Sequence, residues 1–165
     1  MKAHVNREFG RFAYLGRFAY LGRFAYLGRF ACLGLSVFAA VLTSLALPNE
    51  IFAYGNPLLA GLAVSPLFSA VYQSPSRRFA GLAGALFALI SSLLTYFWLL
   101  FFQDFSVWTV GGVTLAHIFY FYIFSQFLFS LKNTDSPSRP FVMAAAWVVF
   151  EYIKSIGYLG FPWGL

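Results

Sequence analysis

Residues 79–102 read FAGLAGALFALISSLLTYFWLLFF, and these 24 residues contain no Asp, Glu, Lys or Arg. The 27 residues of the next apolar run, 105–131, also lack these four types and carry His117. A helix of 24 residues is about 36 Å long, which exceeds the roughly 30 Å hydrocarbon core of a bilayer. The two runs therefore predict membrane-spanning helices and an all-α fold.

The composition extends this prediction to the whole chain. Of its 165 residues, 61% are hydrophobic and 10% are charged, whereas soluble domains carry about 25% charged residues. A soluble protein of this size could not bury so much apolar surface. The net charge of +6 does not indicate a nucleic-acid partner, because the basic residues lie in the gaps between apolar runs.

Three further apolar runs complete a predicted polytopic membrane helical bundle of about five transmembrane helices. They cover residues 30–48, 56–72 and 141–160. The run at 56–72 is shorter than the others, and we expect Pro57 and Pro66 to interrupt it.

The distribution of charge between the runs predicts the topology. The gaps after the first and third runs contain Glu50 and Asp104 and no basic residue. Basic residues fill the alternate gaps: Lys2, Arg7, Arg11, Arg17, Arg23 and Arg29, then Arg77 and Arg78, then Lys132 and Arg139. Because Lys and Arg favour the cytoplasm, the N-terminus is predicted to be cytoplasmic and the C-terminus periplasmic.

A six-residue repeat, Arg-Phe-Ala-Tyr/Cys-Leu-Gly, occupies residues 11–34. Neither a helix nor a strand with this repeat would have one polar face and one apolar face. Residues 1–34 are therefore set apart as a basic-aromatic segment, before a membrane domain at 35–165. Two interpretations remain open: an expanded coding repeat, or a segment that lies on an anionic cytoplasmic leaflet.

Small residues four positions apart predict close contacts between helices. The pairs are Ala80/Gly84, Gly81/Ala85 and Gly112/Ala116. Cys32 is the only cysteine, so an intramolecular disulfide and a cysteine metal cluster are excluded, and no metal site is predicted.

Residues Glu151 and Lys154 are the candidate site. Helical spacing puts them on one face with Trp147, Ser155 and Tyr158. Ionisable side chains at membrane depth are costly unless they are paired, so their presence points to function. The pair either fixes the helix orientation or forms the polar wall of a groove for a lipid head group.

His117 is the other ionisable side chain within a predicted span. We expect it to be hydrogen-bonded and to face the bundle, in preference to acting as a proton relay.

The closing segment of the chain carries a resemblance. Trp147 is followed by Glu151, by Lys154 and then by Gly-Phe-Pro-Trp at 160–163. This pattern resembles the membrane domain of bacterial apolipoprotein N-acyltransferase, and the similarity extends over about residues 35–165. Enzymes of that family transfer an acyl chain from a phospholipid to a diacylglyceryl lipoprotein, through a thioester on a cysteine.

The resemblance implies a multi-pass protein of the bacterial inner membrane whose partners are phospholipid and a diacylglyceryl lipoprotein, with no cofactor. It also implies a lipid or substrate groove formed by Glu151, Lys154, Phe161, Pro162 and Trp163. The family's Glu-Lys-Cys triad belongs to a nitrilase-like domain that has no match in this sequence. No residue here is therefore assigned a catalytic role.

The leading hypothesis is a truncated or split membrane portion that is inactive alone. One alternative is a non-catalytic lipid-binding or scaffold protein that acts with a partner, such as a separately encoded catalytic half. The other is a small transporter subunit that uses His117 and Glu151.

Overall fold

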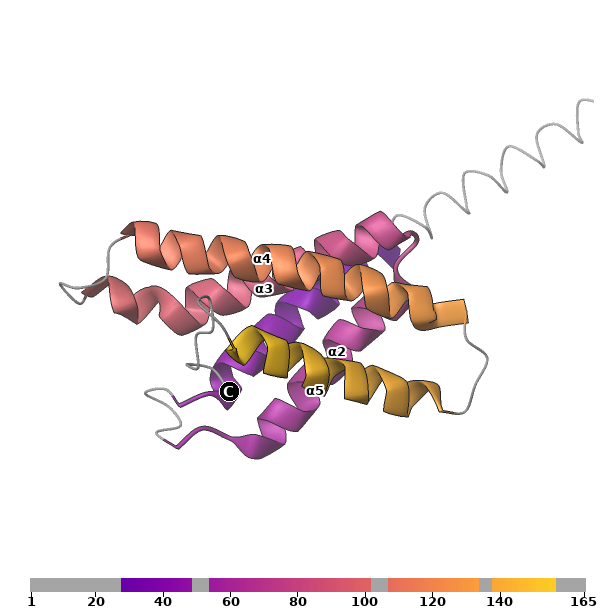
Figure 1. Ribbon diagram of the computed structural model, residues 1–165, viewed down its shortest axis with the longest axis horizontal. Coiled ribbons are helices and arrows are strands. Elements are labelled where there is room, and N and C mark those ends of the chain that lie inside the picture. The colour runs from indigo at the N-terminus through magenta and orange to yellow at the C-terminus, as the bar shows by residue number, and fades with distance from the viewer. Residues whose placement is uncertain (1–27, 49–53, 102–106, 134–137, 157–165) are drawn as a thin grey trace, which may run out of the picture.

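The computed structural model describes residues 28–48, 54–101, 107–133 and 138–156. These ranges contain five α-helices and no strand (Figure 1), which confirms the all-α prediction. The helices are Gly28–Ala46, α2 (Pro57–Gln73), α3 (Arg77–Tyr96), α4 (Val107–Ser130) and α5 (Arg139–Ser155), and the 3-10 segments η1 (Phe97–Phe101) and η2 (Leu131–Asn133) follow α3 and α4.

Three of the helical segments are long and apolar enough to cross a membrane. They are Gly28–Ala46, Arg77–Phe101 and Val107–Ser130, and α2 is a shorter apolar helix. Each corresponds to one of the apolar runs in the sequence. The full set of five spans and the orientation of the termini stay predictions.

Polar caps explain where two of the helices begin. The side chain of Asn56 accepts hydrogen bonds from the backbone N–H groups of Leu58 and Leu59, at 3.1 and 3.2 Å, and Pro57 occupies the first turn. Ser76 accepts a bond from the Phe79 N–H at 3.2 Å. Because Ser76 caps α3, the helix includes both arginines that precede the apolar run at 79–102.

The expected interruption of the second helix does not occur. Pro57 lies in the first turn of α2, where the missing N–H costs nothing, and the helix passes through Pro66 without a break. Proline at an internal position removes one backbone hydrogen bond of the helix. In a bundle, groups from neighbouring helices can satisfy the carbonyl that loses its partner, so the helix continues.

Helices α3 and α4 are closely packed, more so than α2 with either of them. A Cβ atom on Gly84 would lie 2.5 Å from the carbonyl oxygen of Phe121, and one on Gly81 would lie 2.7 Å from the ring of Tyr122. The prediction of close approach is therefore confirmed for the small residues of α3. It is wrong for Gly112, which is exposed on α4 and has no neighbour within 4 Å of an added Cβ.

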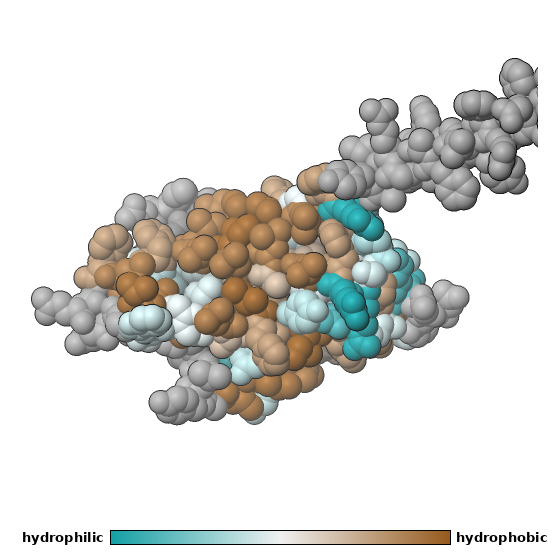
Figure 2. Space-filling view, turned by 90° about the horizontal axis from the view of Figure 1, so that it is seen from above, coloured by the Kyte–Doolittle hydropathy of each residue, from teal (hydrophilic) through white to brown (hydrophobic). Residues whose placement is uncertain are grey.

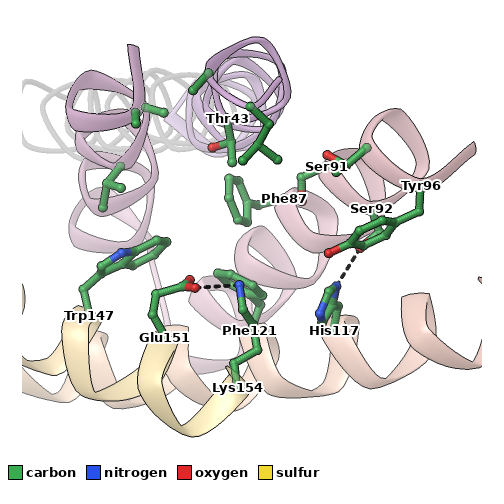
Figure 3. Close-up of a pocket in the computed structure, with 16 residues that line it drawn as sticks. Thr43, Phe87, Ser91, Ser92, Tyr96, His117, Phe121, Trp147, Glu151 and Lys154 are labelled. Atoms are coloured by element: carbon green, nitrogen blue, oxygen red, sulfur yellow. Dashed lines mark hydrogen bonds and ion pairs between the residues drawn. The ribbon is translucent and has the colours of Figure 1, made fainter. Parts of the chain in front are cut away.

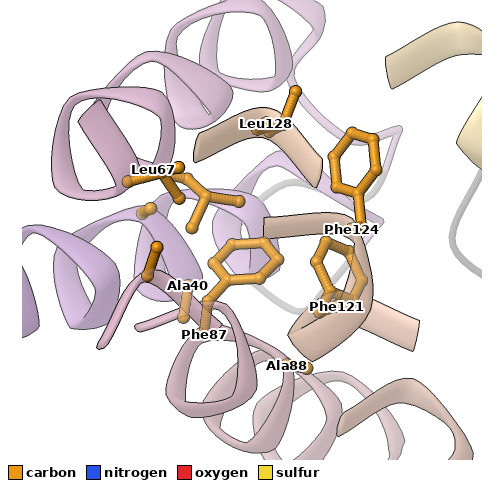
Figure 4. Packing of buried hydrophobic residues seen from close by; sticks show 10 residues of the cluster. Ala40, Leu67, Phe87, Ala88, Phe121, Phe124 and Leu128 are labelled. Carbon is orange, nitrogen blue, oxygen red and sulfur yellow. The ribbon is translucent and has the colours of Figure 1, made fainter. Parts of the chain in front are cut away.

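Large side chains complete the core next to this tight contact. Phe87 from α3 packs against Phe121 from α4 with ring centroids 4.9 Å apart, and Leu67 from α2 and Phe124 join the same cluster (Figure 4). Small residues on α3 bring α4 close, and the aromatic rings fill the space on either side.

Helix α5 contacts the bundle through aromatic rings. The ring of Phe150 stacks on Phe124 with centroids 4.1 Å apart, and Trp147 lies 5.9 Å from both Phe68 and Phe124. None of the described α5 side chains is fully buried. Bulky contacts of this kind leave space beside the helix, and that space holds the candidate site.

The first copies of the six-residue repeat lie outside the described residues. The last copy, residues 29–34, forms the start of the helix Gly28–Ala46. The predicted boundary between residues 34 and 35 therefore falls within one continuous helix, and the division into two domains stays a prediction.

Candidate functional site

A cavity of about 270 Å³ lies between all five helices (Figure 3). Each helix supplies part of its wall: Thr43 from the first helix, Val64 from α2, Tyr96 from α3, His117 from α4 and Glu151 from α5. The volume is too small for a whole lipid and is sufficient for a head group. It is lined by apolar side chains with a few convergent polar groups, as ligand pockets usually are.

The cavity extends from the middle of the bundle toward one end. Its residues come from the C-terminal parts of the first helix, α3 and α5, from the N-terminal part of α2 and from the middle of α4. The chain alternates in direction from helix to helix, so these terminal parts meet at the same end. Lys132 and Arg139 lie at the opposite end, where α4 ends and α5 begins.

Glu151 and Lys154 form an ion pair in the cavity wall. Lys154 Nζ lies 2.7 Å from Glu151 Oε2, and the exposed fractions of the two side chains are 12% for Lys154 and 19% for Glu151. The ammonium group also lies 6.0 Å from the centre of the Phe121 ring. A cation held between a carboxylate and an aromatic face is well compensated for the loss of water.

The pairing expected from the three-residue spacing is thus confirmed. Trp147 also lines the cavity, one turn before Glu151 on the same face of α5 (Figure 3).

His117 supplies a second polar group to the cavity. Its Nδ1 lies 3.1 Å from the hydroxyl oxygen of Ser92 on α3, and the ring of Tyr96 lies 5.7 Å from the imidazole. Both His117 and Ser92 are buried. The expectation of a hydrogen-bonded histidine that faces the bundle is confirmed.

Other hydroxyl groups around the cavity donate to the backbone of their own helices. The Thr43 hydroxyl donates to the carbonyl of Ala39 at 2.9 Å, and the Ser91 hydroxyl donates to the carbonyl of Ala88 at 3.3 Å. Their oxygens can still accept a hydrogen bond from a ligand. The charged pair on α5 and the imidazole on α4 are therefore the strongest groups available to a polar ligand.

Three sequence-predicted site residues lie outside the described part of the chain: Phe161, Pro162 and Trp163. Tyr158 does so as well. The structure consequently brings Trp147, Glu151 and Lys154 together and gives no position for the Gly-Phe-Pro-Trp motif relative to them.

Sequence reasoning missed the contribution of α3. Ser91, Ser92, Thr95 and Tyr96 all line the cavity. Their spacings of three and four residues within an otherwise apolar run were a usable signal, because polar residues at that spacing share one helix face. Cys32 is buried in the first helix and does not line the cavity. Among the described residues, no group of three or more His, Cys, Asp or Glu could hold a metal ion.

Comparison with known proteins identifies the membrane domain. A family model described as apolipoprotein N-acyltransferase N-terminal domain matches residues 39–165. The chain belongs to this family. The resemblance seen in the residues around Glu151 is confirmed.

Three relatives show how much of a full enzyme the match covers. Apolipoprotein N-acyltransferase 2 of Treponema denticola is 33% identical over 126 residues, which is 76% of this chain and 24% of the relative. The corresponding protein of Treponema pallidum is 32% identical over 129 residues, 78% of this chain and 23% of the relative. Apolipoprotein N-acyltransferase of Borreliella burgdorferi is 34% identical over 132 residues, 79% of this chain and 25% of the relative.

The chain thus spans about a quarter of the length of these curated relatives. No solved structure matches it. The cavity therefore belongs to the N-terminal membrane domain of the apolipoprotein N-acyltransferase family.

Proposed function

We propose that this chain supplies the membrane portion of an apolipoprotein N-acyltransferase and that its cavity receives the polar head group of a phospholipid. The observation that carries the proposal is the Glu151–Lys154 ion pair in the cavity wall. Charged side chains in an apolar bundle mark substrate or ion pathways. The family membership favours a lipid over other polar ligands.

The chemistry of the wall suits a lipid head group. The ammonium of Lys154 can bind a phosphate oxygen, while Glu151 and the imidazole of His117 can receive hydrogen bonds from an amine or hydroxyl. Apolar residues of the wall, such as Val64 and Phe87, would contact the start of the acyl chains. No role in acyl transfer itself is assigned to Glu151 or Lys154.

The proposed setting is the bacterial inner membrane, with five spans and a cytoplasmic N-terminus. In that orientation the end of the bundle with Lys132 and Arg139 faces the cytoplasm, and the cavity extends toward the periplasmic end. A lipoprotein substrate anchored in the outer leaflet would meet the lipid at this side. Phe161, Pro162 and Trp163 are proposed to continue the groove beyond α5.

Photo-crosslinking of the full chain in phospholipid nanodiscs tests the cavity. A photoreactive amino acid at Thr43 reports from the cavity wall, and one at Leu115, which is 67% exposed on α4, reports from the outer surface. We expect lipid adducts at both positions. Lys154→Met should reduce the adducts at Thr43 several-fold and leave those at Leu115 unchanged, and Lys154→Arg should restore them. Equal yields at Thr43 with and without the Lys154 charge would contradict a head-group site.

A transporter remains a second candidate because His117 and Glu151 line the same cavity. Both are already engaged, His117 with Ser92 and Glu151 with Lys154, which favours a binding role over proton movement. Proton flux into vesicles that contain the full chain separates the two hypotheses. A flux that disappears in Glu151→Gln would support the transporter, and no flux above that of empty vesicles would exclude it.

A further inference from the structure

Three chain segments bring basic and aromatic side chains together at the end of the bundle opposite the cavity. Lys132 in η2 places its Nζ 5.5 Å from the centre of the Tyr72 ring of α2 and 5.3 Å from that of Phe129. The guanidinium of Arg139, which begins α5, lies 5.4 Å from the same Tyr72 ring. Two cations therefore lie against one aromatic ring.

A hydrogen bond from a side chain to the backbone holds Arg139 next to Lys132. Arg139 Nη1 donates to the carbonyl oxygen of Lys132 at 3.0 Å. Lys132 and Arg139 are half-buried, and Tyr72 is 43% exposed. The site is consequently built from positioned groups and remains open to its surroundings.

The cluster has no matching negative charge in the described part of the chain. Glu151 is the one carboxylate side chain among the residues that the structure describes, and it is paired with Lys154 at the other end. Two like charges that converge on one ring repel each other, and the repulsion is relieved when an anion binds between them. Arg77 and Arg78, exposed at the start of α3, add to the positive potential of this end.

Exposed apolar side chains occur close to the cations in the sequence. Phe141 and Val142 follow Arg139 on α5 and are 77% and 45% exposed, and Phe127, five residues before Lys132 on α4, is 48% exposed. Figure 2 shows hydrophilic residues gathered at one end of a largely hydrophobic surface. Positive groups above an apolar surface fit a ligand that has an anionic head and hydrocarbon chains.

We propose that Tyr72, Lys132 and Arg139 form a binding site for the head group of an anionic phospholipid. The phosphate would lie between the two cations, and the acyl chains would follow the apolar surfaces of α4 and α5. A zwitterionic head group should bind less tightly, because it also carries a positive charge and the site already contains two cations. A free phosphate ion would make no use of the exposed apolar residues. The site is separate from the cavity and does not depend on the proposed function.

Native mass spectrometry of the full chain, released from nanodiscs of mixed composition, measures the preference. Phosphatidylglycerol and phosphatidylcholine with identical acyl chains are the two probes. The wild-type chain should retain phosphatidylglycerol preferentially, and Lys132→Gln combined with Arg139→Gln should lower that preference about tenfold. Arg77→Gln combined with Arg78→Gln removes the same charge from this end of the bundle and keeps the two cations against Tyr72, so it is the matched control, with an expected loss of at most about threefold. If both double variants lost the lipid preference equally, the preference would come from the overall positive charge of this end and not from a defined site. That result would overturn the proposal.

Further measurements keep the test decisive if the double variant folds poorly. Lys132→Arg combined with Arg139→Lys keeps both charges and should retain the preference. In the wild-type chain, a photoactivatable phosphatidylglycerol should label peptides from η2 and the start of α5 above peptides from α3. Labelling spread evenly over the helices would contradict a defined site.

Two competing anions give distinct results. Inorganic phosphate that displaces the lipid at equal concentration would identify a small-anion site and overturn the lipid assignment. Asp135 lies outside the described residues, and Asp135→Asn should leave retention unchanged. A several-fold gain in phosphatidylglycerol retention in this variant would mean that the Asp135 carboxylate of the wild-type chain already neutralises the cations, which would contradict the proposal.

Discussion

The hydroxyl of Ser92 and the Nδ1 of His117 lie 3.1 Å apart and form a side-chain hydrogen bond between α3 and α4. The bond crosses the close contact between α3 and α4 and lies at the wall of the cavity. Both partners are buried, so neither can exchange the other for bulk water without a local opening of the bundle.

Ser92→Ala should lower the free energy of unfolding by about 0.5–1 kcal/mol, because it leaves a buried imidazole nitrogen without its partner. Ser91→Ala is the matched control. The Ser91 hydroxyl donates within its own helix to the Ala88 carbonyl, and its loss should change stability by less than about 0.3 kcal/mol. Unfolding by SDS titration in mixed micelles measures both values. Equal losses in the two variants would show that the interhelical bond adds no stability.

The ion pair on α5 should be sensitive to the removal of either partner. Glu151→Gln or Lys154→Met alone leaves one charge in the cavity wall, and each should lower the free energy of unfolding by about 1–3 kcal/mol. The combined variant should lose less than the sum of the two. A double-mutant cycle by SDS titration measures the coupling between the residues, and purely additive losses would mean that the 2.7 Å contact carries no net energy.

The sequence was sufficient for the helices and for half of the site. Apolar runs longer than a bilayer core gave the long helices, and the three-residue spacing gave the Glu151–Lys154 contact. The spacing of Ser92 and Tyr96 indicates that they share a face of α3, but whether that face turns toward α4 depends on tertiary packing. That rotation is set by Gly81, which makes room for the Tyr122 side chain, and by Gly84, where the backbone of α4 approaches α3. The same sequence pattern at Gly112 produces no contact, since periodicity alone does not say which small residues face a neighbour.

This contrast between glycines leads to opposite predictions for one substitution. Gly84→Ala should lower the free energy of unfolding by about 1–3 kcal/mol, because the new methyl group would lie 2.5 Å from the Phe121 carbonyl oxygen and would also meet Ser125. Gly112→Ala adds a methyl group in open space and should be neutral or stabilise by up to about 1 kcal/mol through helix propensity. Thermal unfolding in detergent, followed by circular dichroism, compares the two variants. A loss in Gly112→Ala as large as that in Gly84→Ala would contradict the observed α3–α4 contact.

The aromatic attachment of α5 can be tested at Trp147, which packs on Phe68, Phe121, Phe124 and Phe150. Trp147→Ala should destabilise the chain by about 2 kcal/mol, since the ring is half-buried and its removal enlarges the adjacent cavity. The loss of stability should be confined to α5, because the close packing of α3 on α4 does not involve the Trp147 ring.

Hydrogen exchange in nanodiscs distinguishes local from global loosening. In Trp147→Ala, the backbone amides of α5 should exchange faster, while those of α3 and α4 keep their protection. Trp108→Ala is the matched control, because Trp108 is 88% exposed on α4 and its removal leaves α5 in place. Uniformly faster exchange across all the helices would show that α5 is an integral part of one cooperative unit, and the view of α5 as a separately attached wall of the cavity would be wrong.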